Sequence, residues 1–132
     1  MKVLIIDDEE AVRVLMQDTL CLDGHQVLVA RDGVWGLRML REQRPQIVIT
    51  DIIMPEQEGL GTIRMMRREY PEVKIIAISG GGRVGNVDLL EAATSLGADD
   101  ALAKPFLPDD LLNKVNRLAM GQPASKLDLQ II

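Results

Sequence analysis

Val3-Leu4-Ile5-Ile6-Asp7-Asp8 is a run of four aliphatic residues that ends on two carboxylates. An uninterrupted aliphatic run of this length is typical of a strand buried on both faces of a parallel sheet. Two later runs also lead to groups suited to phosphate chemistry, because Asp51 follows residues 47–50 and Lys104 follows residues 101–103. Parallel strands that lie side by side bring such groups to one edge of the sheet. The sequence therefore predicts a metal and phosphoryl site at that edge.

The composition indicates one globular domain. A chain of 132 residues that is 47% hydrophobic and 27% charged can bury a core of its own. The net charge of -5 and the pI near 4.8 disfavour a nucleic-acid surface, which needs clustered Lys and Arg. The first apolar run is short and is followed by acids, so it fits neither a secretory signal nor a membrane span. Cys21 is the only cysteine, so no internal disulfide can form and a cytoplasmic location is expected. From the charge and the short apolar run we expect contact with neither nucleic acid nor membrane.

Short apolar runs alternate with amphipathic stretches along the chain. The runs are residues 3–6, 27–30, 47–49, 73–78 and 101–103. The stretches between them repeat apolar residues at intervals of three and four, as a helix with one buried face does. In the first stretch these residues are Val12, Leu15, Met16, Thr19 and Leu20. The alternation predicts an α/β fold, a flavodoxin-like, doubly wound parallel sheet of five strands in the order 2-1-3-4-5 with five helices.

Asp7, Asp8 and Asp51 are the candidate metal ligands. Carboxylates brought this close repel one another unless a hard cation lies between them, and Mg²⁺ prefers oxygen ligands. A carboxylate beside such a cation and the ammonium of Lys104 can attack a phosphoryl group and form an acyl phosphate. Ser79 ends the fourth run and has a hydroxyl that can donate to a phosphoryl oxygen. These residues together predict phosphoryl chemistry.

Each acid also has a plainer interpretation when it is taken alone. Asp7 and Asp8 can simply open the first helix, with Glu9 and Glu10 in its first turn, where acids complement the helix dipole. Asp51 precedes a predicted loop, and Asp is a common turn residue. The order of the signals along the chain is what distinguishes a site from these local roles.

That order resembles the receiver domain of two-component response regulators. The shared signals are Asp-Asp after the first strand, Asp-x-x-Met-Pro after the third, Ser after the fourth and Lys-Pro-Phe after the fifth. The resemblance covers residues 2 to about 120. It implies that Asp51 accepts a phosphoryl group from a phosphohistidine of a sensor kinase or a histidine phosphotransfer protein, as one step of a phosphorelay. Lys104 would pair with the phosphoryl group, and the bond before Pro105 is often cis in the family.

The resemblance also implies a Mg²⁺ site and a conformational output. Asp8, Asp51 and the backbone carbonyl of Ile53 would ligate Mg²⁺, and Asp7 would act mostly through water. Ser79 would move toward the phosphoryl group and shift a conformational equilibrium that a downstream protein senses. Such a protein is not a conventional enzyme, because it catalyses only its own phosphorylation and dephosphorylation. Many receivers also form homodimers through their fourth and fifth helices, so a homodimer is one expectation.

The end of the chain has the composition of a linker. Gly121-Gln122-Pro123-Ala124-Ser125 follows the last predicted helix. We expect a receiver domain over residues 1–120 and a tail or linker over residues 121–132. So short a tail cannot hold a helix-turn-helix domain, which favours a stand-alone regulator. A receiver excised from a longer chain is the alternative.

The chain departs from the receiver pattern in its predicted switch. Ala101 stands where receivers usually carry Tyr or Phe, so the usual aromatic half of the switch is missing. Residues 80–86 contain four glycines, and this segment is either a plain flexible loop or the moving part that replaces the aromatic. A receiver that only carries phosphate is a further alternative.

Two features of the predicted surface stand out, an apolar pair on the second helix and a group of arginines on the third. Trp35 and Met39 lie one helical turn apart and are predicted to form an exposed apolar pair, either a packed shoulder or a partner contact. Arg64, Arg67 and Arg68 form a charge cluster on the third helix, which we interpret as a solvated face.

Two other functions compete with the receiver interpretation. A pseudo-receiver that never binds phosphate is supported by Ala101 but disfavoured by the complete set of Asp8, Asp51, Ser79 and Lys104. A Mg²⁺-dependent phosphatase of the haloacid-dehalogenase type would need Asp-x-Asp after the first strand, whereas the acids here are adjacent.

Overall fold

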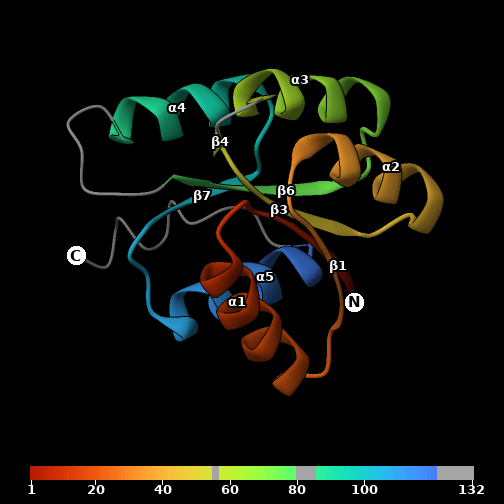
Figure 1. Cartoon of the computed structure of the whole chain (residues 1–132), viewed down its shortest axis with the longest axis vertical. Coiled ribbons are helices and arrows are strands. Elements are labelled where there is room, and N and C mark those ends of the chain that lie inside the picture. Colours follow the sequence, from red (N-terminus) through yellow and green to blue (C-terminus); the bar gives the residue numbers. More distant parts are fainter. Residues whose placement is uncertain (55–56, 80–85, 122–132) are drawn as a thin grey trace.

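Five parallel strands form one sheet between two layers of helices (Figure 1). The computed structural model describes residues 1–54, 57–79 and 86–121. The strands are β1 (Lys2–Ile6), β2 (Gln26–Ala30), β3 (Ile47–Asp51), β6 (Lys74–Ser79) and β7 (Asp100–Ala103). Their spatial order is β2-β1-β3-β6-β7, and every neighbouring pair is parallel. The predicted doubly wound sheet in the order 2-1-3-4-5 is therefore confirmed.

The helices divide between the two faces of the sheet. α1 (Glu10–Leu22) and α5 (Pro108–Ala119) cover one face, and α2 (Gly33–Gln43), α3 (Gly59–Glu69) and α4 (Asn86–Leu96) cover the other (Figure 1). Successive strand side chains point to opposite faces. Accordingly Ile5 lies in the core cluster under α1 and α5, while Leu4 and Ile6 lie in the cluster under α2 and α3. The central strands β1, β3 and β6 are buried on both faces, which explains why most of their residues are aliphatic.

The first helix begins later than the sequence indicated. α1 starts at Glu10 and Glu9 is its N-cap residue, so the prediction that Asp7 and Asp8 open this helix is wrong. Instead, the Asp7 carboxylate accepts a hydrogen bond from the backbone N–H of Glu9, at 2.9 Å. Leu15 was also predicted to be buried, but it is 45% exposed. The acids therefore belong to the edge of the sheet and not to the helix.

A short antiparallel pair was not predicted. β4 (Ile53–Met54) and β5 (Gln57–Glu58) lie between β3 and α3. Two residues per strand carry no periodic signal, which is why the sequence pattern did not reveal them. The glycine-rich segment at residues 80–85 and residues 122–132 of the predicted tail lie outside the described residues. Within the described part of the chain, no helix is both long enough and apolar enough to cross a membrane.

Gly59 allows α3 to start directly against the backbone that follows β3. A Cβ atom at Gly59 would lie 2.4 Å from the Cα and 2.6 Å from the carbonyl oxygen of Ile52. Backbone atoms cannot yield as a flexible side chain does, so Gly59→Ala is expected to lower the free energy of unfolding by about 2 kcal/mol. Urea unfolding followed by circular dichroism measures this loss.

Gly61→Ala is the matched control for that variant, because Gly61 is exposed in the same helix. Alanine there should raise stability by up to about 1 kcal/mol through helix propensity. Equal stability of the two alanine variants would show that the close approach at Gly59 does not matter.

Arg67 is a structural residue of α3, which corrects part of the sequence interpretation. Arg64 and Arg68 are exposed as predicted, but the Arg67 side chain is only 27% exposed. Its guanidinium donates to the carbonyl oxygens of Gly97, Pro71 and Val73, each at 2.9 Å, and lies 2.5 Å from the Asp99 carboxylate. The solvated-face interpretation was wrong for Arg67 because two of its partners, Gly97 and Asp99, lie 30 and 32 residues away in sequence.

Candidate functional site

The register of the sheet brings Asp7 and Asp51 together. β1 pairs with β3 so that Ile6 lies opposite Thr50. The next residue of each strand is therefore an Asp, and both carboxylates leave the sheet at its carboxyl edge. Asp7 is fully buried and Asp51 is 2% exposed. This edge, where the strand order reverses, is the usual ligand site of doubly wound sheets.

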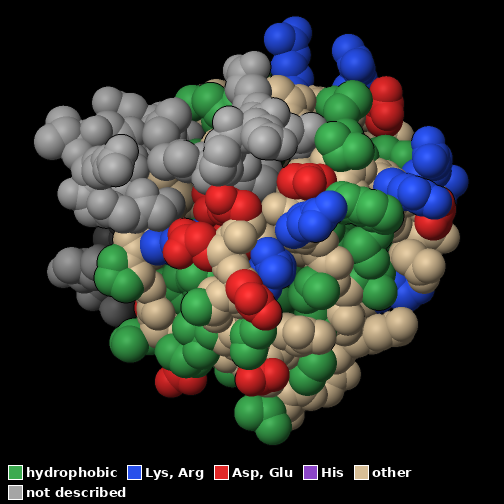
Figure 2. All heavy atoms as spheres, viewed as in Figure 1, with side chains coloured by type: hydrophobic (Ala, Val, Ile, Leu, Met, Phe, Trp, Pro, Cys, Tyr) green, Lys and Arg blue, Asp and Glu red, His purple; other side chains and the backbone are tan. Residues whose placement is uncertain are grey.

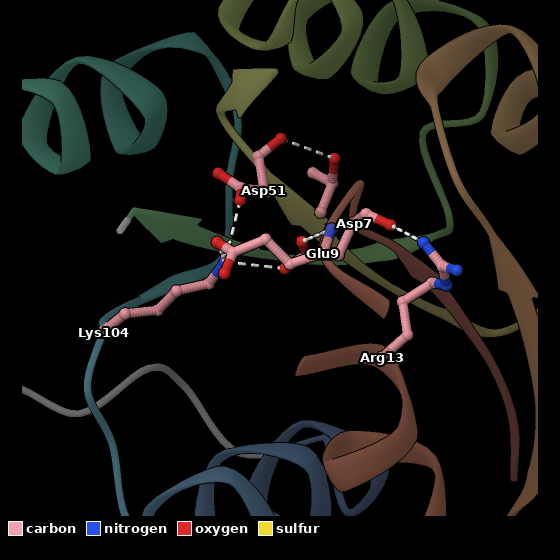
Figure 3. Close-up of polar contacts among 6 residues, drawn as sticks. Asp7, Glu9, Arg13, Asp51 and Lys104 are labelled. Carbon is pink, nitrogen blue, oxygen red and sulfur yellow. Dashed lines mark hydrogen bonds and ion pairs between the residues drawn. The ribbon is translucent and has the colours of Figure 1, made fainter. Parts of the chain in front are cut away.

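Lys104 joins the acids through its ammonium group (Figure 3). Its Nζ lies 2.8 Å from Asp7 Oδ2, 2.9 Å from Asp51 Oδ2 and 3.1 Å from Glu9 Oε1. Lys104 comes directly after β7 and its peptide bond to Pro105 is cis, as expected. The Lys104 side chain is 9% exposed. A buried cation thus lies among three carboxylates.

Glu9 was not predicted as a member of the site. Glu9 stands in the predicted first turn of the helix, where acids are common, and no local pattern distinguishes it from such residues. Its side chain is 59% exposed, yet it reaches Lys104 from a position 95 residues away in sequence. The position of Glu9 just before α1 makes this contact possible.

The environment shifts the pKa values of two groups. Burial raises the pKa of the Asp7 carboxyl above its ordinary value, and the ion pair with Lys104 and the hydrogen bond from the Glu9 N–H only partly oppose this effect. Burial by itself would lower the pKa of Lys104, but its contacts with Asp7 and Asp51 outweigh burial and raise that pKa. Lys104 therefore stays protonated and provides the positive charge of the pocket.

The acids of the pocket suit a divalent cation. Asp7, Asp8, Glu9 and Asp51 each offer a carboxylate oxygen, and these oxygens lie within 4.8 Å of one another. Asp7 Oδ2 is buried and accepts no hydrogen bond within the described structure, although it faces the Lys104 ammonium. Asp8 is exposed, so one side of the cluster is open to solvent. A cluster of hard oxygens with a buried, incompletely satisfied member has the donor chemistry that Mg²⁺ prefers.

The remaining predicted residues lie close to this edge. Ser79 is buried at the end of β6, the strand next to β3, and its carbonyl oxygen accepts a hydrogen bond from the N–H of Lys104 at 2.8 Å. Ile53 begins β4, two residues after Asp51. Ala101 on β7 lies opposite Ala77 on β6 and is partly exposed. No aromatic ring therefore stands at this point of the sheet.

Arg13 also contacts the strand end that carries Asp7. Arg13 lies in the first turn of α1, and its guanidinium donates a hydrogen bond of 2.7 Å to the Asp7 carbonyl oxygen (Figure 3). Arg13 was not predicted as part of the site, because an Arg at the start of a helix gives no signal of its own. The contact fixes the backbone of Asp7 and brings a positive charge beside the acids.

Comparison with known proteins identifies the family. A family model described as the response regulator receiver domain matches residues 3–116. The response regulator MprA of Mycobacterium avium is 33% identical over 118 residues, which make up 89% of this chain and 50% of that protein. The chain spans about half the length of the curated relatives it matches.

Solved structures agree with this result. The receiver domain of NtrX from Brucella abortus superposes with a TM-score of 0.81 at 30% identity, covering 87% of this chain and 95% of that one. A CheY-like receiver domain protein from Methanospirillum hungatei gives a TM-score of 0.82 at 26% identity, covering 92% and 94%. The chain therefore belongs to the response regulator receiver domain family. Its class is that of the phosphoryl-accepting modules of two-component systems, which interact with kinases or phosphotransfer proteins and with downstream targets.

Proposed function

We propose that Asp51 of this chain accepts a phosphoryl group from a phosphohistidine of a sensor kinase or a histidine phosphotransfer protein. The observation that carries the proposal is the position of Lys104, whose ammonium lies 2.9 Å from Asp51 Oδ2 and 2.8 Å from Asp7 Oδ2 in a largely buried pocket. An ammonium held beside a carboxylate can offset the charge of an incoming phosphoryl group.

The transfer is a displacement at phosphorus. A carboxylate oxygen of Asp51 forms the new P–O bond while the P–N bond to the donor imidazole breaks, and the imidazole keeps that electron pair. Lys104 balances the negative charge that builds up on the phosphoryl oxygens. Ser79, on the neighbouring strand, would donate its hydroxyl hydrogen to one of those oxygens. Water later attacks the phosphorus, breaks the bond to Asp51 and releases inorganic phosphate, which resets the protein.

Mg²⁺ is the proposed cofactor of the transfer. Asp8, Asp51 and the backbone carbonyl of Ile53 would hold it, with Asp7 acting mostly through water. When bound, the cation would supply positive charge to the phosphoryl oxygens and relieve repulsion among the carboxylates. The cluster of carboxylate oxygens within 4.8 Å of one another supports this assignment.

The proposed output is a shift between two conformations that a downstream protein distinguishes. The extra contacts of the phosphoryl group with Lys104 and Ser79 would favour one arrangement of the strand ends. Because Ala101 provides no ring, the movement would involve backbone segments or helices. Cys21 is exposed and unpaired, which suits a reducing compartment, so we place this exchange in the cytoplasm.

Incubation with acetyl phosphate and Mg²⁺ tests the proposal. The intact protein should gain the mass of one phosphoryl group, and a chelator such as EDTA should suppress the gain. Addition of hydroxylamine should remove the group, since it attacks acyl phosphates. No gain in mass would favour the pseudo-receiver, whereas steady turnover of p-nitrophenyl phosphate would favour the phosphatase.

A further inference from the structure

An apolar surface on α2 is exposed around the only tryptophan of the chain. Trp35 is 44% exposed, Val34 beside it is 64% exposed, and Val29 on β2 is 36% exposed. Figure 2 shows hydrophobic side chains flanked by Lys and Arg side chains on the side of the molecule where Figure 1 places α2. Met39 was predicted to share this exposure, but it packs against the core cluster. We call the surface of Val29, Val34 and Trp35 the Trp35 surface.

Two hollows adjoin Trp35. One, of about 580 Å³, lies between α2 and α3 and is lined by Trp35 together with Leu37, Met65 and Tyr70. The other, of about 420 Å³, extends across β2 toward α1 and is lined by Trp35 together with Val29, Met39 and Arg13. The hollow between α2 and α3 is mainly apolar, whereas the hollow across β2 is lined by apolar side chains and by arginines. Trp35 can therefore contact side chains inserted on either side of its ring.

The rim of the Trp35 surface is basic, although the chain carries a net charge of -5. The charged residues that line the two hollows are four arginines, Arg13, Arg31, Arg38 and Arg41, and one acid, Glu69. Arg38 lies over the Trp35 ring, 5.3 Å from its centroid. Arg38 also pairs with Glu42, and Arg31 lies 3.9 Å from Asp32, but Arg41 pairs with no acid within the described residues. The local charge is therefore opposite in sign to that of the whole chain.

We propose that the Trp35 surface binds an acidic segment of a partner protein that carries large apolar side chains. The apolar side chains would enter the hollows beside Trp35, and the acids would meet Arg31, Arg38 and Arg41. Charge complementarity favours this occupant. A continuous polyanion, such as a nucleic acid or an anionic membrane, would also bring negative charge beside Asp32 and Glu42, which would repel it. A protein segment can avoid this repulsion, because its acids can stand opposite the arginines alone.

The Trp35 surface also approaches the acidic pocket. Arg13 lines one hollow and donates to the Asp7 carbonyl oxygen at 2.7 Å. A bound segment would thus contact the same residue that fixes the strand end carrying Asp7. The proposal does not depend on phosphoryl acceptance, because it concerns the charge and shape of the surface alone.

Selection from a displayed library of random short peptides tests the proposal. The enriched peptides should combine Asp or Glu with Leu, Phe or Trp. Fluorescence anisotropy of labelled synthetic copies should then give affinities at least about tenfold weaker for Trp35→Ala and for Arg38→Glu/Arg41→Glu than for the unaltered protein. Binding should also weaken as salt is raised and should shift the emission of Trp35.

Arg64→Glu/Arg68→Glu is the matched control, because it changes the net charge equally on the exposed face of α3. This variant should retain its affinity, and circular dichroism should show that all variants are folded. Enrichment of basic peptides, failure to enrich any peptide, or equal binding by Arg38→Glu/Arg41→Glu would overturn the proposal. So would a shift of Trp35 emission by phosphatidylserine vesicles or by an oligonucleotide.

Discussion

Replacement of Asp51 by Asn is expected to abolish phosphoryl acceptance while the protein stays folded. The amide keeps the size of the side chain but has no anionic oxygen to attack phosphorus. Lys104 retains its contact with Asp7, at 2.8 Å, so the buried ammonium keeps a charged partner. Intact mass after incubation with acetyl phosphate and Mg²⁺ should show no phosphoryl group on Asp51→Asn under conditions that modify the unaltered protein.

Asp18→Asn is the matched control for Asp51→Asn. Asp18 is exposed on α1, so the same chemical change occurs far from the predicted nucleophile. This variant should gain one phosphoryl group at the rate of the unaltered protein. A phosphoryl group on Asp51→Asn that resists hydroxylamine would place the acceptor on a different kind of residue.

Replacement of Arg67 by Ala is expected to cause the largest loss of stability. The guanidinium donates to three backbone carbonyl oxygens and pairs with Asp99, and Asp99 Oδ2 in turn accepts from the Ile75 N–H at 2.8 Å. The truncation leaves a partly buried carboxylate and several carbonyl groups without this donor. We expect the free energy of unfolding to fall by about 3 kcal/mol, which urea unfolding can measure.

Arg68→Ala provides the comparison. The Arg68 side chain is 73% exposed and lies 4.0 Å from Glu69, so its loss should change stability by less than about 0.5 kcal/mol. Arg67→Lys should restore only part of the loss, because an ammonium cannot match the fork of the guanidinium. A small effect of Arg67→Ala would mean that solvent replaces these hydrogen bonds without cost.

Close packing around Gly97 explains why the Arg67 contacts need a glycine at this point. Gly97 follows α4 with φ of +130°, and a Cβ atom there would lie 2.8 Å from Arg67 Cβ. Arg67 and Gly97 are 30 residues apart, and only the packing of α3 against α4 brings them together.

The sequence by itself determined the sheet, its strand order and the edge at which Asp7, Asp51 and Lys104 meet. Aliphatic runs identify buried parallel strands, and the right-handed crossover restricts how such strands can be arranged. Side chains that follow neighbouring parallel strands then share one edge. These rules depend only on residues within one run or on two consecutive runs. The pattern of residues along the chain was therefore enough to predict the sheet and this edge.

Only the tertiary structure decided which side chains complete the site and the surfaces. Glu9 contacts Lys104, Arg13 donates to the Asp7 carbonyl oxygen, and Arg67 joins α3 to the carbonyl of Gly97, 30 residues away. The same is true of the basic rim around Trp35, whose arginines come from α1, α2 and the segment after β2. Such contacts depend on the directions of long side chains once helices have packed, and no local periodicity encodes them.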